Sequence, residues 1–177
     1  MPLSRTEFAG QMPDAAPVSA AIALRLALYQ PDIPQNAGTM LRTCACLGIG
    51  AALIEPAGFP VSDRHFRRAG MDYLDCVTID RHVSFAAFEL WRAGMRAQSG
   101  GHRLVLLSTH ADLPYTQFAF AADDIVMVGR ESAGVPEAVR TAADASLRIV
   151  MRPPLRSLNV AVAAAMILGE ALRQLRR

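Results

Sequence analysis

Three short polar segments interrupt an otherwise apolar sequence and carry the residue types that could bind a ligand or do chemistry. They are Asn36–Arg42 (NAGTMLR), Gly129–Pro136 (GRESAGVP) and Arg156–Asn159 (RSLN). Each lies where a strand-like run gives way to a helix-like run. Open α/β sheets bind ligands at the carboxyl ends of their strands. We therefore take these three polar segments together as the candidate active site.

Composition excludes several kinds of chemistry at such a site. All 18 residues of the Lys+Arg count are arginine, so the chain offers neither a Schiff-base lysine nor the lysine of a Walker A loop. The four histidines are scattered, with no H-x-x-x-H pair and no carboxylate cluster, and give no support for a metal centre. Of these, His110 ends a strand-like run, and we expect it in a pocket wall. Three cysteines match neither a disulfide framework nor a C-x-x-C metal site, so we expect buried thiols: Cys44, Cys46 and Cys76.

Two short sequences resemble known functional motifs, but the order of the surrounding elements or residues excludes both motifs. Gly48 and Gly50 resemble the start of a dinucleotide fingerprint, but they follow a helix-like segment and precede a strand, which reverses the required order. We assign Gly48 to the end of a helix instead. Ser132 lies between a strand and a helix, as the serine of a nucleophile elbow does, but every histidine precedes it, whereas the hydrolase order places the histidine after the serine. A serine hydrolase is therefore not expected.

Length and composition indicate one soluble domain. The chain has 177 residues, 52% of them hydrophobic, and no apolar run approaches the roughly 18 residues that span a bilayer. Residues 1–18 are polar and lack the apolar region of a signal peptide, so we expect a cytoplasmic protein. We divide the chain into an N-terminal extension, residues 1–21, and one domain, residues 22–177. A net charge of +2 does not by itself indicate a nucleic-acid binder, although clustered arginines would still permit one.

Short apolar runs alternate with helix-length segments along the domain. The runs are apolar on both faces, as expected for strands of a parallel sheet that is covered on both sides. The expected strands are Leu24–Tyr29, Ala51–Ile54, Cys76–Ile79, Leu104–Leu107, Ile125–Val128 and Leu147–Val150. The expected helices are Gln35–Leu47, Asp63–Ala69, Phe85–Arg96, Pro136–Ala143 and Asn159–Arg176. This order predicts an α/β fold, a doubly wound parallel sheet flanked by helices.

Taken in order, four stretches of the sequence resemble the SPOUT class of RNA methyltransferases. They are YQPDIPQNAGTMLRTCACLG, EPAGFPVSDRHFRRAGMDYLD, VMVGRESAGVPEAV and LRIVMRPPLRSLNVAVAAAM. The resemblance covers roughly residues 24–175 and is greatest to the small single-domain tRNA 2′-O-methyltransferases that modify the ribose of the wobble nucleotide, a cytidine or uridine. The segment Arg67–Tyr73 (RRAGMDY) points to that subgroup. One difference concerns substrate choice: many wobble-ribose enzymes continue after Asn159 with Leu-Ser-Asn, and this chain has Val-Ala-Val.

The resemblance implies a trefoil knot in the C-terminal third, with S-adenosyl-L-methionine bound in it and no metal. Matched residue by residue, the cofactor contacts are Leu107, Gly129, Ile149 and Ser157. Without the resemblance, Leu107 and Ile149 would be assigned to ordinary strand core. Transfer of a methyl group from a sulfonium to an oxygen is an in-line displacement, so the protein has to align the reactants and remove the proton of the ribose hydroxyl.

The resemblance also implies a set of catalytic and RNA-binding residues: Arg42, Asn36, Glu131 and Asn159 for catalysis, and Arg156, Arg67 and Arg68 for RNA. Arg42 would position the phosphate and the hydroxyl of the target nucleotide. Two roles are open for Asn36, which caps its helix or holds the catalytic loop, and two for Asn159, which caps the last helix or contacts the cofactor or the ribose. Glu131 either pairs with an arginine or braces the site.

In this class the site is completed across a homodimer, so we expect a dimer that uses the knot and the last helix and binds the tRNA anticodon stem-loop. Two alternatives remain. One is a 2′-O-methyltransferase of another RNA, such as ribosomal RNA, and the other is a non-catalytic RNA-binding or assembly factor of the same fold.

Overall fold

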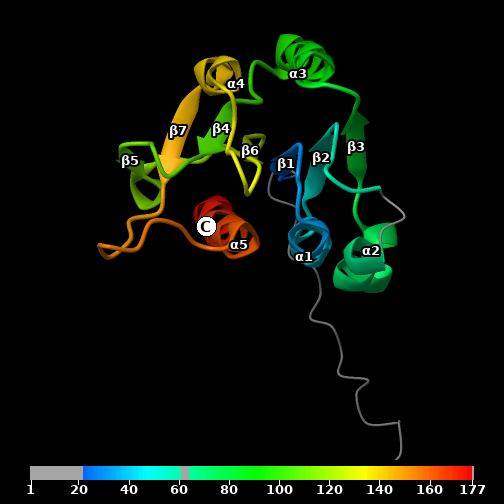
Figure 1. Ribbon diagram of the computed structural model, residues 1–177. Helices are drawn as coiled ribbons and strands as arrows, with labels where there is room; N and C mark the ends of the chain where they lie inside the picture. The colour runs from blue at the N-terminus through cyan, green and yellow to red at the C-terminus, as the bar shows by residue number, and fades with distance from the viewer. Residues whose placement is uncertain (1–21, 61–63, 177) are drawn as a thin grey trace, which may run out of the picture.

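A parallel β-sheet between two layers of helices forms the body of the protein (Figure 1). The computed structural model describes residues 22–60 and 64–176, so the extension predicted for residues 1–21 lies outside it. The described strands form one seven-stranded sheet in the order β3-β2-β1-β6-β4-β7-β5. They are β1 (Arg25–Tyr29), β2 (Gly50–Ile54), β3 (Ile79–His82), β4 (Leu104–Leu107), β5 (Leu113–Pro114), β6 (Ile125–Val128) and β7 (Ala145–Arg148).

Helices cover both faces of the sheet, as the two-sided apolar runs predict. Figure 1 shows α1, α2 and α5 on one face and α3 and α4 on the other. Their bounds are α1 (Pro34–Leu47), α2 (Arg64–Gly70), α3 (Phe85–Ser99), α4 (Glu137–Ala142) and α5 (Val160–Leu175). Two 3₁₀ helices, η1 (Met71–Cys76) and η2 (Tyr115–Gln117), complete the described elements. None of these helices has both the length and the hydropathy that crossing a bilayer requires.

The alternation of side chains along β1 produces two separate cores. Leu26 and Leu28 pack in the cluster under α1 and α5, whereas Ala27 and Tyr29 pack with Phe88 of α3 on the opposite face. Successive side chains of a strand point to opposite faces, so a central strand must be apolar at every position. That requirement explains why the central strands were readable from the sequence.

The direction in which the chain leaves the sheet reverses between β1 and β6. These two strands are parallel neighbours, yet β1 continues into α1 on one face and β6 continues towards α4 on the other (Figure 1). In open α/β sheets, this kind of reversal opens a crevice at the carboxyl ends of the strands. Two of the three polar segments follow these two strands and are brought side by side there.

Most of the predicted elements agree with the structure to within a few residues, and the differences have physical causes. The strand predicted at Cys76–Ile79 is wrong in position, because η1 continues to Cys76 and pairing with β2 begins at Ile79. β3 is an edge strand with the polar sequence IDRH, so a search for two-sided apolar runs could not find it. The two-residue edge strand β5 was missed for lack of length.

The last predicted strand, Leu147–Val150, is also displaced. β7 pairs with β4 over residues 145–147 and ends at Arg148. The apolar residues that suggested a later end have other surroundings, since Ile149 lines a cavity and Val150 is 66% exposed.

The expectation of buried thiols holds for one cysteine and is wrong for two. Cys44 is buried in α1, and burial raises the pKa of its thiol to about 12. Cys46 and Cys76 are exposed.

Particular residues set the start and the end of helix α1, and a glycine inside it allows close packing of a neighbouring helix. Pro34 occupies its first turn, and Gly48 ends it in the left-handed conformation (φ 70°), with its N–H donating to the carbonyl of Ala45. This confirms Gly48 as a helix terminus. Inside α1, a Cβ added to Gly38 would lie 2.4 Å from the carbonyl oxygen of Phe66. Only glycine lets α2 approach α1 this closely.

We expect Gly38→Ala to lower the free energy of unfolding by about 1–3 kcal/mol, because the new methyl group must push α2 away from α1. Gly94→Ala is the matched control, since Gly94 lies inside α3 with nothing within 4 Å of an added Cβ. Alanine is the better helix former, so this control is expected to be neutral or stabilising by up to about 1 kcal/mol. Urea unfolding followed by circular dichroism measures both variants, and equal stabilities for the two would contradict the close packing of α1 on α2.

Candidate active site

The loops that follow β1 and β6 are joined by reciprocal hydrogen bonds. The carboxylate of Asp32 accepts hydrogen bonds from the backbone N–H of Glu131 at 3.0 Å, from the N–H of Ser132 at 3.3 Å and from the Ser132 hydroxyl. In return, the backbone N–H of Asp32 donates to Glu131 Oε2 at 3.3 Å. Loops almost 100 residues apart in the chain are thereby fixed to each other at the crevice.

Side-chain amides extend this connection to the third polar segment. Asn36 Nδ2 donates to Glu131 Oε1 at 3.1 Å, and Asn159 Nδ2 donates to Asn36 Oδ1 at 2.9 Å. Asn159 Oδ1 accepts hydrogen bonds from the backbone N–H groups of Ala161 and Val162 and so caps α5. We call Asp32, Asn36, Glu131, Ser132 and Asn159 the loop network.

The hydrogen bonds of the loop network show which of the structural roles left open by the sequence these side chains take, while the contact of Asn159 with a cofactor or ribose stays a prediction. Asn36 does not cap α1, whose N-cap is Ile33, and instead bridges Glu131 and Asn159. Glu131 binds an amide and a backbone N–H, as a bracing residue does. Asn159 does cap α5, and the same side chain reaches Asn36. Sequence reasoning missed Asp32, although an acidic residue just before Pro34 and the start of a helix was a readable signal.

The two carboxyl groups of the network differ in their affinity for protons. The side chain of Glu131 is the main cause that holds the pKa of Asp32 below its ordinary value, with further help from the hydroxyl and N–H of Ser132. The pKa of Glu131 is raised, first by burial and then by Asp32. Since two adjacent carboxyl groups resist ionising together, Glu131 is the one that takes up a proton first as the pH falls.

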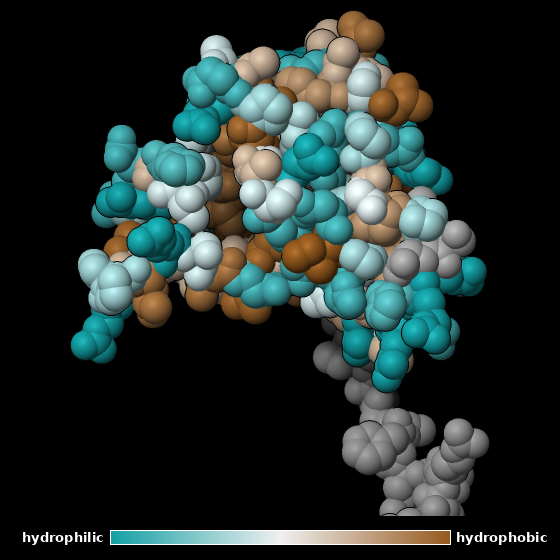
Figure 2. Space-filling model, viewed as in Figure 1, coloured by the Kyte–Doolittle hydropathy of each residue, from teal (hydrophilic) through white to brown (hydrophobic). Residues whose placement is uncertain are grey.

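A cavity of about 280 Å³ lies beside the loop network, at the carboxyl ends of β4, β6 and β7. This volume is close to the lower end of the range of small-molecule sites, roughly 300 Å³. Figure 2 shows a recess floored by hydrophobic residues in this part of the surface. All four residues predicted to contact a cofactor line it: Leu107, Gly129, Ile149 and Ser157.

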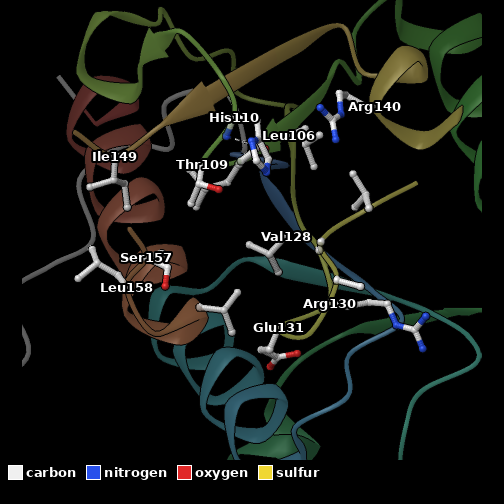
Figure 3. Close-up of a pocket in the computed structure, with 18 of the residues that line it drawn as sticks. Leu106, Thr109, His110, Val128, Arg130, Glu131, Arg140, Ile149, Ser157 and Leu158 are labelled. Atoms are coloured by element: carbon white, nitrogen blue, oxygen red, sulfur yellow. Dashed lines mark hydrogen bonds between the residues drawn. The ribbon is translucent and has the colours of Figure 1, made fainter. Parts of the chain in front are cut away.

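The walls of the cavity come from segments far apart in the sequence. In Figure 3, Ile149, Ser157 and Leu158 lie on one side, and Val128 and Glu131 face them from the other. His110 also lines the cavity, as predicted from its place at a strand end. Because Glu131 belongs to both, the loop network forms part of the cavity wall.

A close approach of two glycines shapes the turn at the end of β6. Arg130 and Gly134 exchange backbone hydrogen bonds of 2.9 and 2.8 Å, and Gly134 has φ 64°. A Cβ on Gly129 would lie 2.7 Å from the backbone carbonyl carbon of Gly134. Backbone rather than side chain therefore forms this wall of the cavity.

Arg42 lies apart from the loop network and does not line the cavity. Its guanidinium Cζ stands 4.9 Å from the ring centroid of Tyr73, and its Nη1 donates to the sulfur of Met71 at 3.1 Å. Both partners belong to η1, next to α2. Within one chain, the predicted catalytic set is thus divided: Asn36, Glu131 and Asn159 are together, and Arg42 is elsewhere.

The three predicted RNA-binding arginines are all exposed. Arg67 and Arg68 lie in the last turn of α2, and Arg156 lies in the segment before α5, next to the cavity residue Ser157. In the part of the chain that the structure describes, no three His, Cys, Asp or Glu side chains gather into a group that could hold a metal ion.

Substitution of Asn159 separates its two roles. Asn159→Ala removes the cap of α5, so we expect a loss of about 1–2 kcal/mol of unfolding free energy. Asn159→Asp keeps a capping oxygen but cannot donate to Asn36, so it should retain most of the stability while changing the side-chain amide NMR signals of Asn36. Urea unfolding measures the stability of the two variants, and ¹⁵N-resolved NMR spectra report on the Asn36 side chain. Unchanged Asn36 signals in the Asn159→Asp variant would contradict the hydrogen bond between Asn159 and Asn36.

Comparison with known proteins agrees with this fold and identifies the family. Residues 23–169 match the model of the SpoU rRNA Methylase family. The chain is 72% identical over 149 residues to a tRNA (cytidine(34)-2′-O)-methyltransferase of Beijerinckia indica, covering 84% of this chain and 90% of that one. It is 35% identical to the protein of the same name from Escherichia coli K12, covering 86% and 94% of the two chains.

Solved structures show the same architecture. A protein studied for 2-OH methylation of C/U34 on tRNA has a TM-score of 0.79 and 41% identity, with 88% of this chain and 98% of that chain covered. The SpoU methyltransferase AviRb from Streptomyces viridochromogenes, in complex with AdoMet, has a TM-score of 0.81 and 31% identity, with 89% and 59% covered. By its sequence, its parallel sheet and the residues gathered around its cavity, this chain belongs to the SpoU rRNA Methylase family.

Proposed function

We propose that the protein transfers a methyl group from S-adenosyl-L-methionine to the ribose 2′-OH of the wobble nucleotide, position 34, of a tRNA. The observation that carries the proposal is the joining of the three polar segments by hydrogen bonds beside one cavity, which the second and third segments line and which the first reaches through the hydrogen bond of Asn36 to Glu131. Relatives that match along most of their length are named tRNA (cytidine(34)-2′-O)-methyltransferases, which supports this substrate over others.

The chemistry of the cavity lining suits S-adenosyl-L-methionine. Leu107 and Ile149 offer apolar walls, the turn at Gly129 offers backbone groups that no side chain blocks, and the Ser157 hydroxyl offers a polar contact. Apolar walls with a few directed polar groups are what binds a nucleoside. When bound, S-adenosyl-L-methionine supplies a methyl group on a positively charged sulfur.

In this proposal, residues of the protein align the ribose hydroxyl with the methyl donor. The loop network holds Glu131 and the N-terminus of α5 in fixed positions at the cavity. Arg42 binds the phosphate beside the target ribose and orients its hydroxyl. An arginine side chain stays protonated in proteins and is a poor proton acceptor, so we assign Arg42 to positioning the substrate and leave the acceptor of the hydroxyl proton unassigned.

The separation of Arg42 from the cavity supports a homodimer whose active site combines two subunits. A groove between α1 and α5 is lined by Asn36, Thr39, Thr43, Asn159 and Met166, among others. Exposed apolar side chains border it, with Val162 51% and Met166 37% exposed. We place the dimer contact here, so that Arg42 of one subunit serves the cavity of the other. The knot in the C-terminal third and the cytoplasmic location belong to the same proposal.

The two alternatives predict different products. A methyltransferase of ribosomal RNA would accept rRNA and leave tRNA unmodified, and an assembly factor would bind RNA without consuming the methyl donor. The family model is named for rRNA, whereas the named relatives are tRNA enzymes. The loop network and the cavity are both intact, which favours an active enzyme.

The purified protein, given S-adenosyl-L-methionine and total tRNA, is expected to produce 2′-O-methylated cytidine or uridine at position 34, detected by nuclease digestion and mass spectrometry. Arg42→Ala should abolish the transfer, by about 100-fold or more, and leave the affinity for S-adenosyl-L-methionine within about twofold by calorimetry, because Arg42 lies outside the cavity. Methylation of rRNA alone, or no methyl transfer at all, would refute the proposal.

Mixed dimers test the shared active site. Arg42→Ala chains, co-purified with Ile149→Trp chains whose cavity is filled, should recover about one quarter of wild-type activity, since half of the dimers are mixed and each has one complete site. Each variant alone should be inactive. No recovery in the mixture would show that Arg42 and the cavity act within one chain.

A further inference from the structure

The segment Arg67–Tyr73, RRAGMDY, contributes no residue to the cavity or to the loop network, yet its last residues surround Arg42. The Tyr73 ring lies 4.9 Å from the guanidinium carbon, and the Met71 sulfur accepts a hydrogen bond from Nη1 at 3.1 Å. Of all the described side chains, these two are the ones that the structure places on the guanidinium of Arg42.

The backbone at Met71, which leads into the segment that carries these two side chains, has an unusual conformation. Met71 has φ 52°, in the left-handed region that a long side chain rarely adopts and that costs conformational free energy. The preceding Gly70 ends α2, and a Cβ there would lie 2.5 Å from Cγ of Leu74. The chain turns sharply at this point and lays η1 against α1. Strain of this kind persists where the surroundings hold it and often marks a functional position.

Both partners of Arg42 are uncharged, and this matters for its role. A guanidinium that stacks on an aromatic ring loses rotational freedom but keeps its full charge and the donors along its edge. Other arginines of the described residues are paired with carboxylates, such as Arg92 with Asp144 and Arg103 with Asp124. The ion pairs within the described ranges do not include Arg42. Its charge is therefore oriented and still available to an anion.

We propose that Tyr73 and Met71 are positioning residues that hold the guanidinium of Arg42 with its edge towards the RNA phosphate next to the methylated ribose. This inference rests on the proposed function, because it takes an RNA phosphate as the ligand of Arg42. Met71 is 51% and Tyr73 is 38% exposed, so a phosphodiester can approach this place directly. Arg67 and Arg68, at the end of α2, add positive charge along the same approach.

Steady-state kinetics on the wild-type dimer, Tyr73→Leu and Tyr73→Phe test the proposal. Loss of the ring should lower kcat/KM for tRNA about 2- to 30-fold, the range of a cation–π contact. Tyr73→Phe keeps the ring, so its kcat/KM should stay within about twofold of wild type. The affinity for S-adenosyl-L-methionine should be unchanged in both. Equal losses in the Phe and Leu variants would overturn the proposal, because the hydroxyl rather than the ring would then matter.

A double-mutant cycle on tRNA binding separates positioning from a general structural effect. If Tyr73 acts through Arg42, Tyr73→Leu should weaken tRNA binding in the wild-type background and have no further effect in the Arg42→Ala background. The same loss in both backgrounds would overturn the proposal. Melting temperatures check folding, and where Tyr73→Leu is unstable, Tyr73→Gln replaces it in the cycle.

The same measurements distinguish this inference from the proposed function. If Arg42→Ala retains full methyl transfer and tRNA binding, the proposed role of Arg42 fails, and the positioning role fails with it. If Arg42→Ala is inactive but Tyr73→Leu matches wild type in kcat/KM and tRNA affinity, the positioning role alone is refuted.

Discussion

The hydrogen bonds of Glu131 are the interaction on which the rest of the site depends. This side chain accepts from the backbone of Asp32 and from Asn36, and Asn36 in turn accepts from Asn159. Asn36 lies 95 residues before Glu131 and 123 residues before Asn159 in the chain. Because Glu131 and Asn36 each bond to two different segments, each of these contacts restrains the others. The position of α5 follows from this, and with it one wall of the cavity.

A second constraint is that the candidate site residues form two separate groups on one chain. The cavity and the loop network form one unit at the crevice, and Arg42 with Tyr73 and Met71 forms another at the contact of α1 with η1. Helix α1 connects them, since it carries both Asn36 and Arg42. With 100° between successive residues of a helix, these two side chains project roughly 120° apart. This separation is the reason for proposing a second subunit that faces the groove between α1 and α5 and brings Arg42 to the cavity.

The sequence was informative wherever one physical requirement dominated. Central strands must be apolar on both faces, and β4 and β6 were predicted to the residue. The four predicted cofactor contacts follow from the resemblance, and all four residues line the cavity. Prediction failed where tertiary contacts override local pattern. β3 is polar because it is an edge strand, and Ile149 is apolar because it lines a cavity rather than a strand interior. No local pattern could show that Arg42 rests on Tyr73, 31 positions along the chain, since that contact follows from the turn at Met71 and the close packing at Gly38.

Ligand binding in the cavity is coupled to the hydrogen bonds of the loop network through one shared residue. Glu131 is part of both, and its raised pKa reflects its burial beside Asp32. A ligand that contacts Glu131 in the cavity and binds the joined arrangement of the loops more tightly than a separated one stabilises the joined arrangement by linkage. The groups that the network fixes include the N-terminus of α5, which also borders the proposed subunit contact. In the proposed dimer, occupation of the cavity and ordering of the subunit contact are expected to reinforce each other, because the hydrogen bond between Asn36 and Asn159 joins the loop network to the groove that both residues line.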